Sequence, residues 1–288
     1  MTLAHIDTGW FASALGAIVF EILFPLLLAF VISRRLKVGW RYFLYGALVF
    51  FVCQLILRVP AVQVIQTVIA PQLQTSPALL WGWLFILALT AGLFEEVGRY
   101  LGYRIFMRNE EKTWNKAVMY GTGHGGIESI LLVAGLGALT LVNLFLLPTL
   151  NLSSLPADQQ KQIVDQFGAI ASQPGWLPLL GAYERLCAIT FQIAMSVVVL
   201  QVFRRGQIRW LWLAVFAHFA FDLAAIGVAQ GLPLLGVTNA TLVTLAAEGV
   251  VTIGALLALW IIVALRDRPS GPMPVGESPV APLQTAMV

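Results

Sequence analysis

The chain has 288 residues, 59% of them hydrophobic and 11% charged, and its formal net charge is +3. Soluble globular domains carry about 25% charged residues, so this composition, with a mean hydropathy of +0.85, excludes that class. The small net charge gives no reason to expect a nucleic-acid partner. Long apolar runs without period-two alternation predict membrane-spanning helices rather than a β-barrel.

Seven apolar segments predict an all-α, polytopic membrane helix bundle. In chain order they cover residues 10–33, 41–59, 77–105, 117–147, 176–203, 209–228 and 238–265. Cys53 and Cys187 fall inside these spans, so a disulfide framework is not expected. We divide the chain into a transmembrane domain at residues 1–268, with a catalytic core at about 77–228, and a disordered tail at 269–288 that is rich in Pro, Gly and Ser.

Basic residues gather in alternate loops of this bundle. They are Arg34, Arg35, Lys37 and Arg41, then Arg104, Arg108, Lys112 and Lys116, then Arg204, Arg205 and Arg209, and finally Arg266 and Arg268. The opposite loops hold only Arg58 and Lys161. Because cytoplasmic loops carry the excess of Lys and Arg, this bias predicts an outside N-terminus, a cytoplasmic C-terminus and a place in a plasma membrane, with a bacterial source expected.

The longest outer loop, residues 148–174, contains a pattern typical of a short surface helix. Ser154 could cap it and Pro156 could occupy its first turn. Four apolar residues then fall on one face, namely Ile163, Val164, Phe167 and Ile170. This helix could simply cover the bundle, or it could act as a lid or a substrate guide.

Ionisable residues inside three spans indicate a functional site, because such groups are costly in lipid unless they face a protein interior or a cavity. Glu95 lies nine residues before Arg104, His124 eight residues after Lys116, and His218 nine residues after Arg209. A rise of about 1.5 Å per residue places Glu95, His124 and His218 roughly 12–14 Å from the basic loops. Three helices therefore bring one carboxylate and two imidazoles to one depth.

Further polar residues are expected beside this trio. Glu128 and Asp222 each follow one of the histidines by four residues, which places them on the same helix face and one turn deeper. Arg99 follows Glu95 by four residues and can pair with Glu95 or Glu96. Glu96 is rotated by about 100° from Glu95, so the two carboxylates are expected to differ in role. Glu96 and Arg99 could also form only a structural ion pair.

Structural interpretations remain open for several polar positions. The two histidines could be hydrogen-bonding residues between helices. The glycines at 121, 123, 125 and 126 are expected to allow close backbone approach and could also leave room for a substrate strand beside His124. Counting along a straight helix places Glu184 and Arg185 about 30 Å from the cytoplasmic end of their span, which indicates a structural pair remote from the cluster. Glu21 and Glu248 are interpreted as internal hydrogen-bonding residues.

The sequence lacks the motifs of three common classes of intramembrane protease. The sequence has no His-Glu-x-x-His zinc motif, no Gly-x-Ser-x-Gly serine motif, and no Gly-x-Gly-Asp motif. A glutamate with two histidines remains. The carboxylate could take a proton from water as the water attacks a peptide carbonyl, while an imidazole positions that water or supplies a proton. A second polar group would have to stabilise the oxyanion.

Three motifs together resemble the YhfC-type branch of the CAAX-protease and bacteriocin-processing superfamily of intramembrane proteases. They are Glu95-Glu96-Val97-Gly98-Arg99, the run from Tyr120 to His124, and His218-x-x-x-Asp222, and the resemblance covers about residues 80–230. It implies a membrane-embedded glutamic-type endopeptidase without a cofactor, in which Glu95 is the base and His124 lies near the water. His218 and Asp222 resemble the oxyanion-binding pair, and Arg99 and Glu128 would support the site.

Two departures from the superfamily pattern bear on the mechanism. Two residues, rather than the usual three, separate Glu96 from Arg99, and Asp222 stands where many relatives have Asn. An ionised Asp cannot donate a hydrogen bond to an oxyanion, so Asp222 would have to be protonated, orient His218, or bind a metal.

Two other classes of function therefore stay open. In a zinc metalloprotease, His124, His218 and one of the carboxylates Glu95, Glu128 or Asp222 would be the ligands. A transporter or bacteriocin-immunity protein would use the same groups as a proton relay or a ligand cradle. For the protease, the expected substrate is a membrane-associated protein or peptide, the expected surroundings are the lipid bilayer, and the site is expected to open toward the cytoplasmic half. The sequence does not indicate the oligomeric state.

Overall fold

A computed structural model describes residues 7–149 and 151–267, so the predicted tail at 269–288 lies outside the described residues. The ten α-helices found there are α1 (Thr8–Leu36), α2 (Arg41–Phe50), α3 (Val59–Thr75), α4 (Pro77–Phe106), α5 (Trp114–Ile127), α6 (Ala134–Leu146), α7 (Ala157–Ala171), α8 (Leu179–Arg205), α9 (Arg209–Leu234) and α10 (Ala240–Ala264). The π-helices η1 (Phe51–Arg58) and η2 (Glu128–Val133) connect α2 to α3 and α5 to α6, and two 3-10 turns, η3 (Leu147–Thr149) and η4 (Leu152–Ser154), follow α6.

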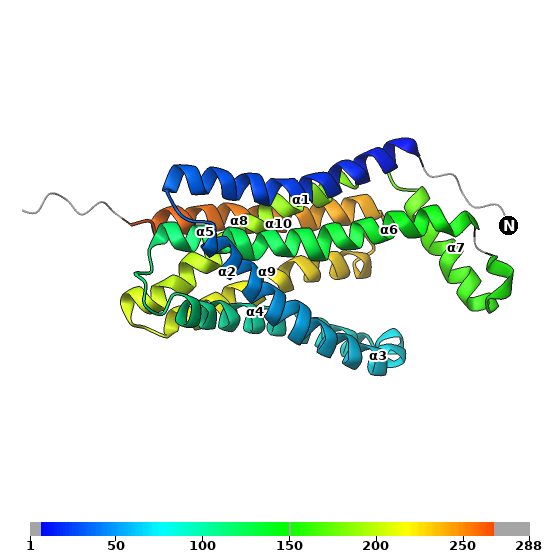
Figure 1. Cartoon of the computed structure of the whole chain (residues 1–288). Helices are drawn as coiled ribbons and strands as arrows, with labels where there is room; N and C mark the ends of the chain where they lie inside the picture. The colour runs from blue at the N-terminus through cyan, green and yellow to red at the C-terminus, as the bar shows by residue number, and fades with distance from the viewer. Residues whose placement is uncertain (1–6, 150, 268–288) are drawn as a thin grey trace, which may run out of the picture.

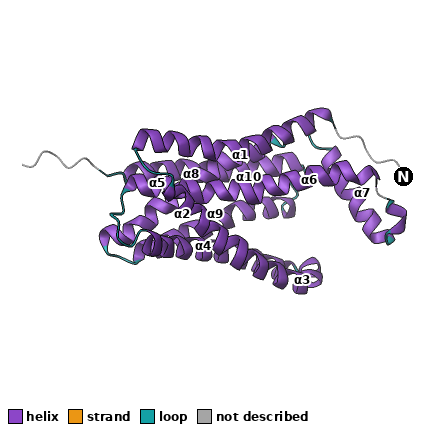
Figure 2. Cartoon of the chain, viewed as in Figure 1, coloured by secondary structure: helices purple, strands orange, loops and turns teal. Residues whose placement is uncertain are grey.

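This architecture confirms the predicted all-α membrane bundle (Figure 2). Within the described ranges there is no strand, and seven continuous helical stretches are long and apolar enough to cross a membrane. Helix α8 forms the centre. In its most apolar 18-residue stretch 78% of residues are buried, compared with 17–28% in the other six. The helices α1, α4, α5, α9 and α10 pack against α8 (Figure 1), while the orientation across the membrane stays a prediction.

Backbone contact between α2 and α5 brings the polar helices together. A Cβ atom at Gly123 would lie only 1.9 Å from the backbone oxygen of Phe43, and one at Gly46 would lie 1.9 Å from that of Tyr120. Only glycine allows helices this close, so the predicted close approach is confirmed. The expected room for a substrate strand beside these glycines is wrong, because α2 and α8 fill that space; a Cβ atom at Gly125, for example, would meet Gln192.

The second span is longer than predicted. It continues through η1 and α3, so Arg58 lies inside the helical stretch rather than at its outer end. Its guanidinium donates to the hydroxyl of Thr90 at 3.2 Å, to the side chain of Gln54 at 3.2 Å and to the backbone oxygen of Leu87 at 2.6 Å. These acceptors offset the cost of burial. Pro60 lies at the junction of η1 and α3, where the regular hydrogen-bond pattern of the α-helix is already interrupted by the π-helix.

The predicted helix of the outer loop is present as α7. Its residues Phe167 and Ile170 pack with Trp10 of α1 and Leu144 of α6. The predicted Ser154 cap is wrong, because the Ser154 hydroxyl donates to the backbone oxygen of residue 151 and Pro156 precedes the first helical residue. Helix α7 therefore covers the ends of α1 and α6.

Candidate active site

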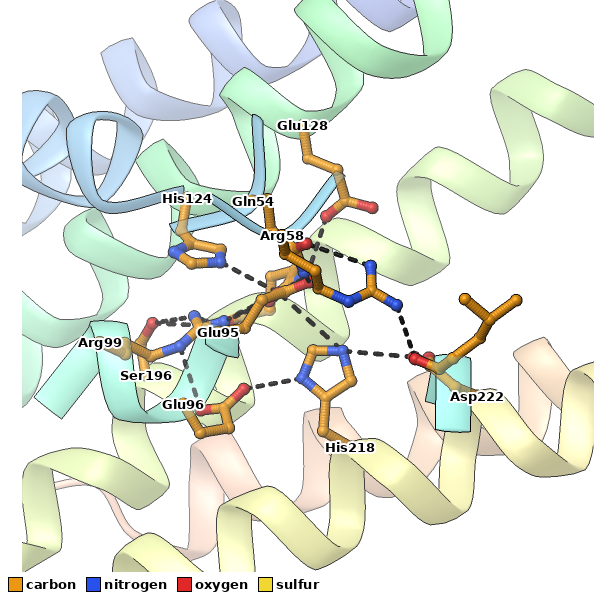
Figure 3. Close-up of polar contacts among 12 residues, drawn as sticks. Gln54, Arg58, Glu95, Glu96, Arg99, His124, Glu128, Ser196, His218 and Asp222 are labelled. Carbon is orange, nitrogen blue, oxygen red and sulfur yellow. Dashed lines mark hydrogen bonds and ion pairs between the residues drawn. The ribbon is translucent and has the colours of Figure 1, made fainter. Parts of the chain in front are cut away.

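Glu95 of α4 is the centre of a buried polar cluster (Figure 3). Its Oε1 accepts a hydrogen bond from Gln54 Nε2 at 2.5 Å, and its Oε2 accepts one from Gln192 Nε2 at 2.9 Å. His124 Nε2 lies 3.1 Å from the same Oε2. Groups from η1, α5 and α8 therefore fix both carboxylate oxygens, which leaves Glu95 little rotational freedom.

His218 of α9 is held with one ring nitrogen facing two carboxylates. Its Nδ1 lies 2.8 Å from Glu96 Oε1, while its Nε2 lies 3.9 Å from Glu95 Oε2 and 3.8 Å from Asp222 Oδ2. Close contact between α4 and α9 makes this possible, since a Cβ atom at Gly92 would meet the Cβ atom of His218 at 3.2 Å. The three residues predicted to share a depth, Glu95, His124 and His218, do meet at one carboxylate oxygen.

Arg99 partly neutralises the two adjacent glutamates. Its Nη2 lies 3.6 Å from Glu95 Oε2 and its Nε 3.1 Å from Glu96 Oε2. Arg99 is fully buried, and its other donors reach Ser196 Oγ at 2.7 Å and the side chain of Gln192 at 2.5 Å. Removing one partner of such a buried pair is strongly destabilising, because it leaves the other charge uncompensated. Arg99 thus pairs with both carboxylates rather than with one.

A second ion pair extends the network away from the basic loops. Arg185 Nη1 lies 3.0 Å from Glu128 Oε1, and Gln192 Nε2 donates to Glu128 Oε2 at 2.9 Å as well as to Glu95. Arg185 also contacts its neighbour Glu184. The expectation that Glu184 and Arg185 are remote from the cluster is therefore wrong.

The predicted depth of Glu184 and Arg185 was wrong in part because the basic ends of α4 and α8 lie at different levels. Gln192 lies thirteen residues before Arg205, whereas its partner Glu95 lies nine residues before Arg104. The basic ends of α4 and α8 therefore differ in level by about four residues, or roughly 6 Å of helix. Counting from those ends places every residue of α8 too far from the cluster.

A cavity of about 310 Å³ lies beside the cluster. Its polar lining comes from Gln54, Arg58, Glu95, Glu128, Glu184, Arg185, Gln192, His218 and Asp222. Among the described residues His124, Glu96 and Arg99 do not line it. On α4 the lining continues from Glu95 to Leu87, and on α9 from His218 to Ile226, which is away from the basic loops in both cases. The cavity therefore lies on the side of Glu95 away from the basic loops, whereas the sequence predicted a site that opens toward them.

Several cavity and cluster residues were missed from the sequence. Gln54, Gln192 and Ser196 are uncharged, so they do not stand out among the ionisable groups that indicate a site inside a membrane. A glutamine inside an apolar span was a usable signal, because buried amides require partners. Arg58 was assigned to a helix end, since nothing in the sequence showed that its helix continues.

Most of the chain matches one known family. Residues 20–246 match the family described as YhfC intramembrane metalloprotease. The chain belongs to the YhfC family. It is 31% identical over 261 residues to the uncharacterized membrane protein YhfC of Bacillus subtilis (strain 168), and the alignment covers 89% of this chain and 96% of the relative. No solved structure matches the chain.

Membership of the YhfC family changes one expectation. A glutamic mechanism without a cofactor is not supported, and the metal-dependent alternative fits the family description better. Placement of the YhfC family in the wider CAAX-protease superfamily is not shown by these matches and stays a prediction. Seven apolar helices and the bacterial membrane relative make this family member a multi-pass protein of a bacterial plasma membrane.

The donor groups of this YhfC family member suit a metal ion. Ligand atoms of Glu95, Glu96 and His218 all lie within 4.8 Å of one another, and imidazole with carboxylate is a donor set that zinc accepts. Glu96 occupies the Nδ1 side of His218, where a carboxylate commonly orients a ligating histidine. His218 Nε2 then faces the cavity between Glu95 and Asp222.

His124 fits a different task. Its Nδ1 is buried and has no hydrogen-bond partner among the described residues. A ligating histidine normally donates its second N–H to an acceptor, which His124 lacks here. An Nε2–H that donates to Glu95 leaves only a lone pair unpartnered, so His124 fits the positioning of Glu95 better than it fits a metal.

The charge balance of the cluster also suits a cation. Five carboxylates, from Glu95, Glu96, Glu128, Glu184 and Asp222, face three guanidinium groups, from Arg58, Arg99 and Arg185. With every carboxylate ionised and both histidines neutral, the difference of five and three is an excess of two negative charges, one of which belongs to Glu184, whose side chain is 42% exposed. Buried charge is costly unless it is compensated, and a divalent ion would compensate it.

Proposed function

We propose that this YhfC family member is a zinc-dependent intramembrane endopeptidase that hydrolyses peptide bonds of membrane-embedded proteins or peptides. The observation that carries the proposal is the buried cluster in which Glu95, His218 and Asp222 converge at one end of a cavity inside the apolar bundle. Intramembrane ionisable groups around a cavity are the expected form of a catalytic site in lipid. The family description agrees with this activity.

Glu95, His218 and Asp222 would hold the metal in this proposal. His218 Nε2 lies 3.9 and 3.8 Å from the two carboxylate oxygens, compared with a spacing of about 3.4 Å between ligands in a tetrahedral zinc site. Among the described residues, the ligand atoms within 4.8 Å of one another are those of Glu95, Glu96 and His218, so Asp222 would have to move toward Glu95 to complete the proposed set. When bound, zinc acidifies water and polarises a peptide carbonyl.

The other residues position these groups and move the proton. Glu96 fixes the ring of His218, while His124 and Gln54 fix the carboxylate of Glu95. Glu128 is a further carboxylate on the cavity wall. We assign it the role of accepting a proton from water at Oε2 and returning it to the leaving amine. Arg185 keeps Glu128 in place for this task.

The test combines metal content with cleavage. Purified full-length protein is reconstituted with a set of transmembrane peptides, and bound metal is measured by mass spectrometry. Wild type should contain zinc and cleave at least one peptide, and chelation should abolish cleavage. Glu95→Gln, His218→Ala and Asp222→Asn should lose both metal and cleavage, because each removes one donor.

Two further variants separate ligands from other groups. His124→Ala and Glu128→Gln should keep the metal and lose most of the cleavage. The control is Glu111→Gln, since Glu111 is exposed in the loop between α4 and α5 and should change neither quantity. Full cleavage by metal-free protein would instead support the glutamic mechanism. If no peptide is cleaved but a peptide is carried across the membrane, the result would support a transporter.

A further inference from the structure

The cavity begins where two tightly packed helices separate. Helices α2 and α5 are in backbone contact at Gly46 and Gly123. Beyond this contact each passes into a π-helix, η1 after α2 and η2 after α5. A π-helix changes the direction and register of side chains and is frequent at functional sites. The continuations α3 and α6 then point to clearly separate places at the end of the bundle near α7 (Figure 1).

The edges of the opening are formed by these two diverging segments. Arg58 and Val59 line the cavity from η1 and α3, and Glu128 and Leu132 line it from η2. The other walls are closed, because α4 packs against α9, and α10 packs against both α8 and α9. None of the residues of α3, all of which are described, is buried. The gap between η1–α3 and η2–α6 is therefore the side on which the cavity faces the lipid.

Exposure rises along the cavity in one direction. The exposed fraction of the side chain is 7% for Glu95, 17% for Glu128, 27% for Asp222 and 42% for Glu184. On the other side of Glu95, Arg99 is fully buried. Tyr103, Tyr120, Met107 and Leu200 are also fully buried and close that side of the cavity. Access from the basic-loop side would require this packed core to open.

We propose that the gap between η1–α3 and η2–α6 is a lateral entrance, through which a membrane-embedded peptide segment reaches the cavity from the half of the bilayer opposite the basic loops. That the segment is a substrate rests on the proposed function. The existence of the entrance does not depend on that function. Val64 and Val68 of α3 are about 70% exposed in a helical stretch that is apolar enough to cross a membrane, although Gln63 and Gln66 are exposed on the same helix. A segment that arrives beside the two valines travels through lipid.

The chemistry of the cavity selects an unwound segment. In lipid a peptide satisfies its amides within a helix, and unwinding exposes them at a cost. Carboxylates, two guanidinium groups and two side-chain amides line this cavity and can accept or donate those hydrogen bonds. A membrane helix with residues that weaken helical structure, such as Gly or Pro, is therefore the favoured class of substrate.

Cysteine labelling tests the path without any need for cleavage. In a full-length background with Cys53→Ala and Cys187→Ala, a single cysteine is placed at Ala225 or Ala188, both on the cavity wall. A thiol reagent attached to a lipid that does not cross the bilayer is added to intact cells and, separately, to inverted vesicles, so that it reaches the protein only through the leaflet to which it is added. A membrane-impermeant thiol reagent reports the exposed side of the basic loops. Glu111→Cys marks the basic-loop side. The cavity cysteines should react only from the side on which Glu111→Cys does not react.

A pair of tryptophan variants tests whether the rim of the gap controls access to the cavity. Leu132→Trp on the rim should slow labelling of the cysteine at position 225 several-fold, whereas Leu131→Trp should not, because the adjacent Leu131 does not line the cavity and is 44% exposed. Labelling from the basic-loop side, labelling from neither side, or equal rates in the two Trp variants would overturn the proposal. Normal one-sided labelling in a protein that cleaves no peptide would leave the path intact and reject only the proteolytic function.

Discussion

The two halves of the bundle on either side of Glu95 are built differently. Toward the basic loops, Arg99 and Glu96 form an ion pair that is completely buried, and Tyr103 stacks on Tyr120 with ring centroids 4.6 Å apart. Toward the other end, the pair of Arg185 with Glu128 is partly exposed beside a cavity. One half is therefore closely packed around the cluster and the other contains the cavity. Under the proposed function, the first would fix the reactive groups and the second would admit a ligand.

This division has a physical reason. Catalytic groups must be held to within a fraction of an ångström, which requires locked side chains around them. A bound segment, in contrast, requires space and accessible hydrogen-bonding groups. Glu95 lies at the boundary, with Arg99 on its packed side and Gln54 and Asp222 on its open side.

The largest expected effect comes from breaking the buried ion pairs of the packed half. Arg99→Gln should cost about 3–5 kcal/mol of unfolding free energy, because it leaves Glu95 and Glu96 without a counter-charge in a dry interior. Arg58→Gln in the open half should cost only about 1–3 kcal/mol, because Arg58 bonds only to neutral oxygens in the described structure. Denaturant unfolding in detergent measures both.

Arg104→Gln is the matched control for this pair of variants. Arg104 is exposed and lies in the last turn of α4, so its loss should change stability by less than about 0.5 kcal/mol. If Arg58→Gln destabilised the protein as much as Arg99→Gln, the proposed difference between the two halves would be wrong.

A smaller effect is expected from a single methyl group in the packed half. Gly123→Ala places a Cβ atom 1.9 Å from the backbone oxygen of Phe43, so α2 and α5 must separate, at a cost of about 1–3 kcal/mol. Gly135→Ala in α6 has open space around the new atom and should stabilise the helix by up to about 1 kcal/mol. A lower unfolding free energy for Gly123→Ala together with a higher one for Gly135→Ala would support the comparison between the two halves. A change in the same direction in both variants would contradict it.

The smallest expected effect concerns the loop that closes the packed half. A hydrogen bond from Tyr42, together with Lys116 and Arg41, holds the pKa of Glu110 below its ordinary value. A lowered native pKa means that this interaction stabilises the protein above the unfolded pKa of about 4.3 and is lost as the pH falls through the native pKa.

Glu110→Gln should therefore remove less than about 1 kcal/mol near pH 7 and should flatten the loss of stability on acidification. Urea unfolding between pH 7 and pH 3 measures the effect, and Glu111→Gln is the control. A steeper loss of stability in Glu110→Gln than in wild type would show that the carboxylate does not stabilise the loop.

The composition and the apolar runs were enough to predict the class of fold. Seven spans were predicted, and the part of the chain that the structure describes contains seven helical stretches that could cross a membrane, because lipid forces each backbone to satisfy its own hydrogen bonds as a helix. The trio Glu95, His124 and His218 was also predictable, since a constant rise per residue converts sequence position into depth. The continuation of the second span through Arg58 was not, because it depends on acceptors from α4.

Depth along a helix is a local property, and the sequence by itself determined it for α4, α5 and α9. Rotation, tilt and relative level of the helices depend on contacts between residues far apart in the chain, such as Gly123 with Phe43. Only the tertiary structure therefore decided that Gln192 and Arg185 join the cluster, that Glu96 holds His218, and that the cavity opens away from the basic loops.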